Sequence, residues 1–147
     1  MKPRIDFYTA SPNALKAMLA LETAVSKLPL EKNLLELIRL RVSQINGCAF
    51  CVDMHAADAR KDGETERRLY AVAVWREAPF FTARERAALA WAESVTLISQ
   101  THAPEADYEQ LSAEFSPAEM VDLTVAIATI NSWNRLAVGF RKLPQED

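Results

Sequence analysis

The chain has few of the residues that interrupt regular structure. It contains only three glycines and two cysteines in 147 residues. No stretch alternates apolar and polar residues over strand length between hairpin turns, which argues against a β-rich fold. A small disulfide-stabilised secreted scaffold is also excluded, because such domains carry many more cysteines. The length suits one compact unit, so we expect an all-α fold in a single domain spanning residues 1–147.

Long apolar runs and clusters of one charge are also missing. The longest apolar stretch, Val125 to Ile130, is far shorter than the about 20 residues that a membrane helix needs. Lys and Arg number 17 against 20 acidic residues, a formal net charge of -3, and no basic run suggests nucleic-acid binding. Residues 1–6 show no apolar core of signal-peptide length. These absences predict a cytoplasmic protein that binds neither membrane nor nucleic acid.

Helical periodicity and capping signals predict a bundle of about six to seven helices. The strongest start signals are Ser11-Pro12 and two capping boxes, Thr82 to Glu85 and Ser116 to Glu119. The expected helices are 12–26, 30–45, 48–61, 64–76, 82–99, 105–115 and 116–138. Residues 1–10 are expected to form an extended arm, and Gly139 is expected to end the last helix.

Both cysteines and one of the two histidines lie in the predicted helix 48–61. At about 100° per residue, Cys48, Cys51 and His55 fall on one helix face. Asn46-Gly47 ends the preceding helix, so Cys48 is expected at a helix N-terminus, where free N–H groups stabilise a thiolate. An imidazole at i+4 from Cys51 can accept its proton. This pattern is typical of a redox-active dithiol.

Glu36 is the fourth candidate residue. It lies two to three turns before the Asn46-Gly47 break, and the short link lets the two helices fold back beside each other. This arrangement permits Glu36 to approach His55 without requiring it. Taken alone, Glu36 is as readily a solvated helix charge.

Other interpretations of these residues remain open. The cysteines can be a pair of small buried residues. Alternatively, Cys48, Cys51 and His55 can bind zinc with Glu36 or water, although structural zinc sites usually draw their ligands from two separate segments. His102, between a predicted helix and a proline, is expected at the surface.

The spacing Glu36-x11-Cys48-x2-Cys51-x3-His55 resembles the active-site signature of the AhpD-like alkylhydroperoxidase branch of the carboxymuconolactone decarboxylase superfamily. The resemblance extends to other segments over nearly the whole chain. They are Arg4 to Tyr8 with Ser11-Pro12, Gly63 to Thr65, Trp75 to Thr82, and Asn131 to Arg135.

This resemblance implies an AhpD-like helical bundle and a thiol-dependent peroxidase that uses no cofactor and no metal. It makes Cys51 the sulfur that attacks a hydroperoxide, Cys48 the sulfur that resolves the sulfenic acid, and His55 with Glu36 the proton relay. It further implies an external dithiol or disulfide-reductase partner and a homo-oligomer, trimer or hexamer. Phe50 departs from the pattern, because several relatives carry a histidine between the cysteines.

Two other functions compete with the peroxidase. The first is a thiol-disulfide oxidoreductase without peroxide specificity, which keeps the dithiol but not the substrate. The second is a non-redox decarboxylase-like or binding protein, since a fold alone does not determine function. Physical chemistry alone leaves the attacking sulfur open and favours Cys48, which is nearer the helix end.

Overall fold

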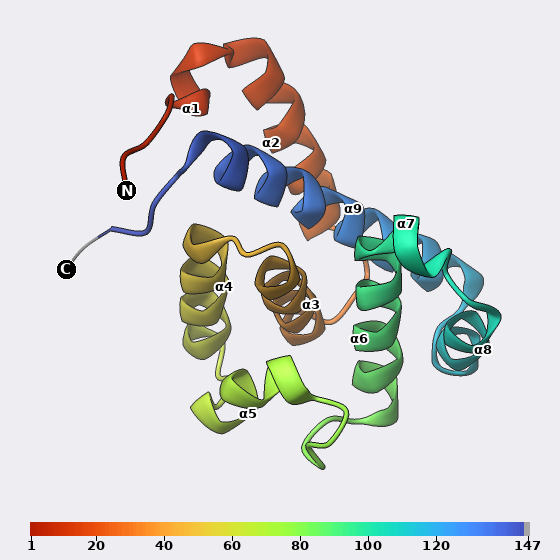
Figure 1. The fold of residues 1–147 in the computed structure, drawn as a ribbon. Coiled ribbons are helices and arrows are strands. Elements are labelled where there is room, and N and C mark those ends of the chain that lie inside the picture. Colours follow the sequence, from red (N-terminus) through yellow and green to blue (C-terminus); the bar gives the residue numbers. More distant parts are fainter. Residues whose placement is uncertain (146–147) are drawn as a thin grey trace.

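The computed structural model describes residues 1–145, which form nine α-helices, one 3-10 helix and no strand (Figure 1). The elements are α1 Phe7–Ala10, α2 Pro12–Ser26, α3 Lys32–Ile45, α4 Ala49–Lys61, α5 Glu66–Ala71, η1 Val72–Val74, α6 Ala83–Thr96, α7 Ile98–Thr101, α8 Glu105–Glu114 and α9 Pro117–Phe140. The all-α prediction is confirmed. The helix count exceeds the expected six to seven because α1 and α7, two short helices of four residues each, were not predicted as separate helices.

Helix α3 lies at the centre of the fold, beside α4, α6 and α9 (Figure 1). Leu37 and Ile38 of α3 are fully buried, as the apolar stripe of this helix predicted. Small side chains allow α6 to approach closely, and Ala87, Ala88 and Ala92 have no exposed surface. The functional residues of α3 and α4 are therefore attached to the most rigidly packed part of the molecule.

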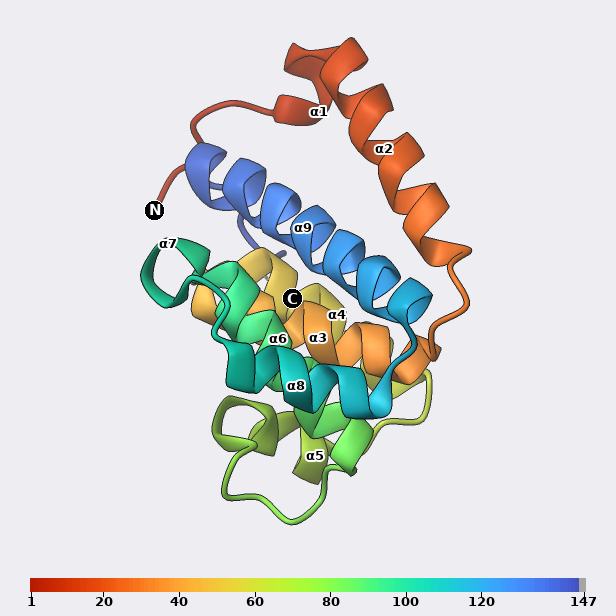
Figure 2. The same cartoon turned by 90° about the vertical axis from the view of Figure 1, so that its right-hand side faces the viewer.

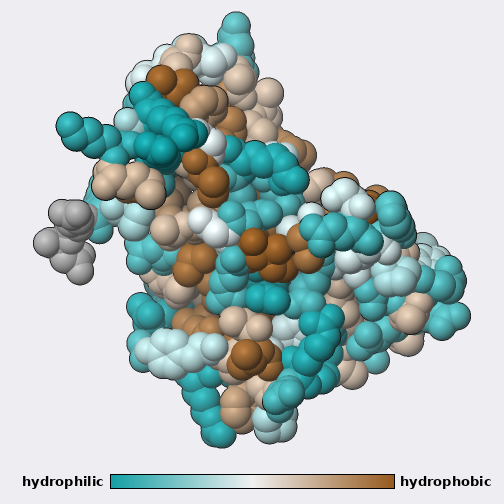
Figure 3. Space-filling view, in the orientation of Figure 1, coloured by the Kyte–Doolittle hydropathy of each residue, from teal (hydrophilic) through white to brown (hydrophobic). Residues whose placement is uncertain are grey.

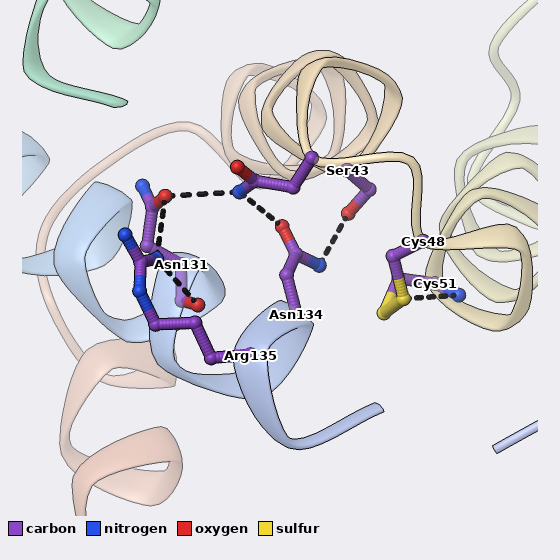
Figure 4. Close-up of a disulfide and its surroundings, with 7 residues drawn as sticks. Ser43, Cys48, Cys51, Asn131, Asn134 and Arg135 are labelled. Atoms are coloured by element: carbon purple, nitrogen blue, oxygen red, sulfur yellow. Dashed lines mark hydrogen bonds between the residues drawn. A yellow bond between two sulfur atoms is a disulfide. The ribbon is translucent and has the colours of Figure 1, made fainter. Parts of the chain in front are cut away.

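The turn between α3 and α4 is held by a network of buried side-chain amides. Gly47 adopts a positive φ of 66°, which only glycine accepts without strain. Asn46 donates from Nδ2 to the side-chain oxygens of Asn131 and Asn134, both at 2.9 Å. Asn134 in turn donates to Ser43 Oγ at 3.0 Å (Figure 4). Asn131 and Asn134 therefore connect α9 to the turn that precedes the cysteines.

Both predicted capping boxes are confirmed. Thr82 and Ser116 each accept a hydrogen bond from the backbone N–H three residues later, and the glutamate at that position bonds back. Helix α2 also begins at Pro12 as predicted. The starts of α6 and α9 were predictable because a helix N-terminus exposes N–H groups that local side chains satisfy. At α2 the Ser11 side chain makes no capping hydrogen bond, and the signal is Pro12 at the first helical position.

The N-terminal arm was predicted incorrectly. Residues 7–10 form the short helix α1, because Asp6 caps it by accepting from the Tyr8 N–H at 3.0 Å. Phe7 is buried, and its ring lies 6.1 Å from that of Phe140, measured between centroids. A contact between the two ends of the chain therefore orders a segment that has no periodicity of its own.

The predicted end of the last helix was also wrong. Helix α9 continues through Gly139 to Phe140, and Arg141 takes the left-handed conformation with φ 55°. Arg4 satisfies two of the free carbonyls at this end, since its backbone N–H donates to Phe140 O and its guanidinium to Gly139 O. The C-cap residue Arg141 satisfies the Ala137 and Val138 carbonyls, and Arg4 from the opposite end of the chain satisfies the next two.

Three other boundaries differ from the predictions. Helix α3 begins at Lys32 rather than at residue 30. The expected helix 64–76 is the shorter α5 followed by the 3-10 turn η1, and the expected helix 82–99 divides into α6 and α7 at Leu97. At this division, the Thr101 hydroxyl donates a hydrogen bond to the Ser94 carbonyl oxygen, with 2.7 Å between the two oxygens. A side-chain hydrogen bond therefore takes the place of a backbone hydrogen bond of the helix at Ser94.

The helix α2 packs mainly on α9 and α1, away from the other helices (Figure 2). Figure 3 shows apolar surface in small patches separated by hydrophilic residues on the face seen in Figure 1. In the described part of the chain, no helix has the length and apolar content to cross a membrane. His102 is exposed, as predicted.

Candidate active site

The two cysteines meet at the start of α4. Cys48 is the N-cap residue of this helix, and its sulfur accepts the Cys51 backbone N–H at 3.3 Å (Figure 4). The two residues are joined by a disulfide, with their Cα atoms 5.3 Å apart, and both are buried. The predicted helix-start position of Cys48 is confirmed, so its sulfur lies where a helix N-terminus favours negative charge.

Glu36 and His55 are in direct contact. The Nδ1 atom of His55 lies 2.9 Å from Glu36 Oε2, and both side chains are buried. An ionised carboxylate can only accept a hydrogen bond, so Nδ1 carries the proton and donates it to Glu36. This leaves Nε2 of His55 as the ring nitrogen that can accept a proton.

Arg39 holds the other oxygen of Glu36. Its Nη1 donates to Glu36 Oε1 at 2.7 Å, and its Nη2 donates to Glu22 of α2 at 2.6 Å. Glu22 also accepts a hydrogen bond from the Trp133 indole at 3.0 Å. These hydrogen bonds therefore form a continuous network that connects α9, α2 and α3 to the imidazole of His55. Its members, in order, are Trp133, Glu22, Arg39, Glu36 and His55.

These contacts determine the charge of Glu36. Burial acts to raise the pKa of its carboxyl group, but the hydrogen bond and charge of His55 and the Arg39 guanidinium outweigh burial. The pKa of Glu36 is therefore held below its ordinary 4.5. Glu36 is a carboxylate at neutral pH and can orient His55.

Cys51, Glu36 and His55 line the same cleft of about 280 Å³, which we call the Cys51 cleft. Most of the remaining wall is apolar. The apolar lining residues are Phe7, Leu19, Phe50, Met54, Ile130, Trp133 and Ala137. Among the three tryptophans, Phe80 and Phe81, only Trp133 lines this cleft. Trp75 and Phe81 are instead buried in the core.

The structure brings all four predicted site residues into one region. Cys48 and Cys51 form a disulfide, and His55 is hydrogen-bonded to Glu36. The sequence did not single out Arg39 and Glu22 as site residues, whereas Trp133 was among the aromatic residues that could line a substrate entry. The offset of three residues between Glu36 and Arg39 was a usable signal, because residues at i and i+3 are neighbours on a helix. No local pattern connected Glu22 to Trp133, which lie 111 residues apart.

One group of possible metal ligands is found among the described residues. Side-chain ligand atoms of Glu36, His55 and Asp58 lie within 4.8 Å of one another. Both oxygens of Glu36 are bonded to His55 and Arg39, and Asp58 is exposed. This group contains no cysteine, unlike the zinc site considered for Cys48, Cys51 and His55. That zinc site requires both sulfurs as free thiolates, whereas in this structure they form a disulfide.

Loss of Arg39 should be costly to stability. The Arg39 side chain is 12% exposed and lies between two carboxylates, so Arg39→Met leaves Glu36 buried without a permanent cation. We expect this variant to lower the free energy of unfolding by about 3 kcal/mol, measured by urea denaturation. Glu22→Gln is the matched control, with an expected loss of about 1 kcal/mol or less, because Glu22 is more exposed. Equal losses in the two variants would contradict this ranking.

The lowered pKa of Glu36 predicts a pH dependence of stability. Its contribution is complete at pH values above the ordinary glutamate pKa and is lost as the pH falls through the lower folded value. The difference in unfolding free energy between wild type and Glu36→Gln should therefore be largest near neutral pH and shrink below about pH 4.5. Urea denaturation of both proteins across this range measures it. A difference that stays constant with pH would disprove this role.

Comparison with known proteins agrees with this geometry. Residues 12–94 match the model of the carboxymuconolactone decarboxylase family. The uncharacterized protein YdfG of Bacillus subtilis is 41% identical over 138 residues, which cover 94% of each chain.

Two solved structures extend the similarity to the fold. ATU0492 of Agrobacterium tumefaciens is a protein of unknown function suggested to be the antioxidant defence protein AhpD. It is 50% identical with a TM-score of 0.97, and the match covers 99% of this chain and 100% of that one. An uncharacterized peroxidase-related protein of Ralstonia eutropha JMP134, described as an alkylhydroperoxidase AhpD core, is 28% identical with a TM-score of 0.81. That match covers 92% of this chain and 72% of the other. The chain belongs to the carboxymuconolactone decarboxylase family, as an AhpD-like member.

Proposed function

We propose that this protein is a thiol-dependent peroxidase that reduces organic hydroperoxides through Cys48 and Cys51. The observation that carries the proposal is the Cys51 cleft, in which a redox-capable sulfur, an oriented imidazole and an apolar wall share one space. An apolar wall suits the organic part of an alkyl hydroperoxide. The similarity to peroxidase-related proteins supports the same reaction class.

The reduced protein begins the cycle with Cys51 as a thiolate and His55 holding the proton. The thiolate attacks the terminal oxygen of the hydroperoxide, the O–O bond breaks, and Cys51 becomes a sulfenic acid while an alkoxide leaves. The Cys48 thiol gives its proton to the alkoxide. The Cys48 thiolate then displaces hydroxide from the sulfenic acid to form the disulfide, and His55 protonates the hydroxide to water.

Phe50 is consistent with this route through His55. It lies between the cysteines and lines the Cys51 cleft as part of its apolar wall. A phenyl ring cannot transfer protons, so in this protein His55 and Cys48 supply the protons that the reaction needs.

A direct test mixes the reduced protein with one equivalent of cumene hydroperoxide and titrates free thiols. We expect loss of both thiols, a mass decrease of two hydrogens and one equivalent of cumyl alcohol. Retention of both thiols, with the hydroperoxide unconsumed, would disprove the proposal.

Disulfide exchange without peroxide specificity is the second candidate. The hydrogen bond from the Cys51 N–H to the Cys48 sulfur favours it, because such a bond stabilises the thiolate needed for exchange. Turnover of cumene hydroperoxide compared with turnover of a model disulfide separates the two enzymes. Full activity of the double variant Cys48→Ser, Cys51→Ser on any substrate would instead support non-redox chemistry.

The proposal includes a cytoplasmic homo-oligomer, trimer or hexamer, that depends on an external dithiol reductant. Helix α2 supports the oligomer, since Val25 is its one buried residue while Leu19 and Leu21 are 48% and 37% exposed. Light scattering of the purified protein measures the assembly. A monomer at micromolar concentration would contradict this part of the proposal.

A further inference from the structure

The disulfide lies between two clefts, and each sulfur-bearing residue lines a different one. Cys51 lines the Cys51 cleft, whereas Cys48 lines a second cleft of about 460 Å³, which we call the Cys48 cleft. Residues from the N-terminal segment 1–6 and from the end of α9 through Leu143 form most of its wall, and these two segments lie side by side (Figure 1). Ala137 of α9 lines both clefts and separates them.

The two clefts differ in charge. The Cys48 cleft is lined by Arg4, Arg141 and Lys142 and by no acidic residue. Among residues 1–145, these three cations take part in no ion pair with a carboxylate. The Cys51 cleft instead contains three carboxylates, those of Glu22, Glu36 and Asp58, and one guanidinium, that of Arg39, which is paired with Glu22 and Glu36. An anionic molecule from solution is therefore attracted more strongly to the Cys48 cleft than to the Cys51 cleft.

The cations near Cys48 bear on the reduction of the disulfide, the step that restores the two thiols after each oxidation. A disulfide is reduced when an external thiolate, itself an anion, attacks one sulfur while the other sulfur leaves. A thiolate in the Cys48 cleft lies against Cys48 and not Cys51. Attack on the Cys48 sulfur releases Cys51 as a thiolate in the cleft that contains His55. This thiolate is the form of Cys51 that reacts with the next hydroperoxide.

We propose that the reductant is a small anionic dithiol that enters through the Cys48 cleft and attacks the Cys48 sulfur, while hydroperoxide enters through the Cys51 cleft. The first thiolate forms a mixed disulfide with Cys48 and breaks the Cys48–Cys51 bond. The second thiol of the reductant, deprotonated, then attacks the reductant sulfur bound to Cys48. Cys48 leaves and takes up that proton, so a dithiol is oxidised as the protein disulfide is reduced.

This inference rests on the proposed function for its catalytic cycle, but its test does not need peroxide. Val138 lines the Cys48 cleft and Met54 lines the Cys51 cleft, and their exposed fractions of 46% and 39% allow a larger side chain without repacking the core. Val138→Trp and Met54→Trp are therefore matched variants. Each narrows one of the two clefts.

Stopped-flow measurements give two rate constants for each variant, one for reduction of the disulfide by 2,5-dimercaptoadipate, a dianionic 1,4-dithiol that closes to a six-membered cyclic disulfide, and one for oxidation of the dithiol by cumene hydroperoxide. Val138→Trp should lower the ratio of reduction to oxidation about tenfold, and Met54→Trp should raise it by a similar factor, because blocked access acts on association. Ratios that move the other way, or do not move in either variant, would overturn the proposal. If hydroperoxide oxidises none of the proteins, the proposed function fails, and the reduction rates still test the entry route.

Charge is tested in the same reaction. Arg141 is in the left-handed conformation, which asparagine tolerates, so the double variant Arg141→Asn, Lys142→Met removes two cations with little backbone strain. We expect reduction by dianionic 2,5-dimercaptoadipate to slow about tenfold, with a smaller effect on reduction by neutral dithiothreitol, which forms the same ring size on oxidation. Equal effects on both reductants would overturn the assignment of an anionic reductant.

The attacked sulfur can be identified directly. Oxidised wild-type protein is mixed with glutathione, an anionic monothiol, quenched in acid within milliseconds and mapped by mass spectrometry. A glutathione adduct on Cys48 is the expected result. An adduct on Cys51 would overturn the proposal, whatever the peroxidase activity.

Discussion

The Cys51→Ser variant is expected to lose hydroperoxide reduction, its rate constant falling by at least about 10³-fold, as when other enzymes lose their nucleophile. Cys51 lines the cleft that contains His55 and Glu36, whereas Cys48 does not. A serine hydroxyl at this position has a much higher pKa than a thiol, and His55 cannot ionise it to a useful extent. Consumption of cumene hydroperoxide with dithiothreitol as reductant measures the loss.

The Cys48→Ser variant is the matched control. It retains the attacking sulfur but cannot form the disulfide, so in the absence of dithiothreitol, which would itself reduce a sulfenic acid, it should consume one equivalent of hydroperoxide and stop. The sulfenic acid on Cys51 should then be trapped by dimedone and located by mass spectrometry. A dimedone adduct on Cys48 of the Cys51→Ser variant would reverse the roles. That outcome has a physical basis, since the Cys48 sulfur accepts the Cys51 N–H at the helix start.

The second large effect is expected at His55. His55→Gln should lower the rate of thiol oxidation by about 10²- to 10⁴-fold, the usual contribution of a positioned acid-base group. Glutamine keeps a hydrogen-bonding side chain beside Glu36 but cannot exchange a proton with Cys51. The rate of iodoacetamide alkylation as a function of pH measures the ionisation of the reduced thiols directly. In the variant, half-maximal alkylation should move to higher pH, because the imidazole no longer stabilises the thiolate.

Glu36→Gln separates orientation from proton transfer. Its amide can bond to either tautomer of His55, so the imidazole is no longer restricted to donating from Nδ1, and a smaller loss of about 10-fold to 100-fold is expected. Asp53→Asn is the control for charge on the same helix as His55, since Asp53 is exposed and lines neither cleft. An unchanged pH dependence of alkylation in both His55→Gln and Glu36→Gln would disprove the relay.

Much of the helical pattern followed from local chemistry. The starts at Ala83 and Pro117 were predictable, because Thr82 and Ser116 lie directly before them and satisfy free N–H groups. The start at Pro12 was predictable from the proline itself, since the Ser11 side chain makes no capping hydrogen bond. The errors fell where distant segments decide. Helix α1 depends on the burial of Phe7 near Phe140, and the end of α9 depends on Arg4.

The sequence by itself determined that Cys51 and His55 share one face of a helix, because the period of the α-helix places residues four apart together. Cys48 does not share that face, since it is the extended N-cap residue and lines the other cleft. The sequence also determined that Cys48 starts that helix, since Asn46-Gly47 ends the preceding one. Only the tertiary structure decided that Glu36 bonds to His55 and that Arg39 connects it to Glu22. It also decided that the two cysteine residues line separate clefts. The physical reason is that these contacts join helices distant in the chain, so they depend on packing angles that no local pattern encodes.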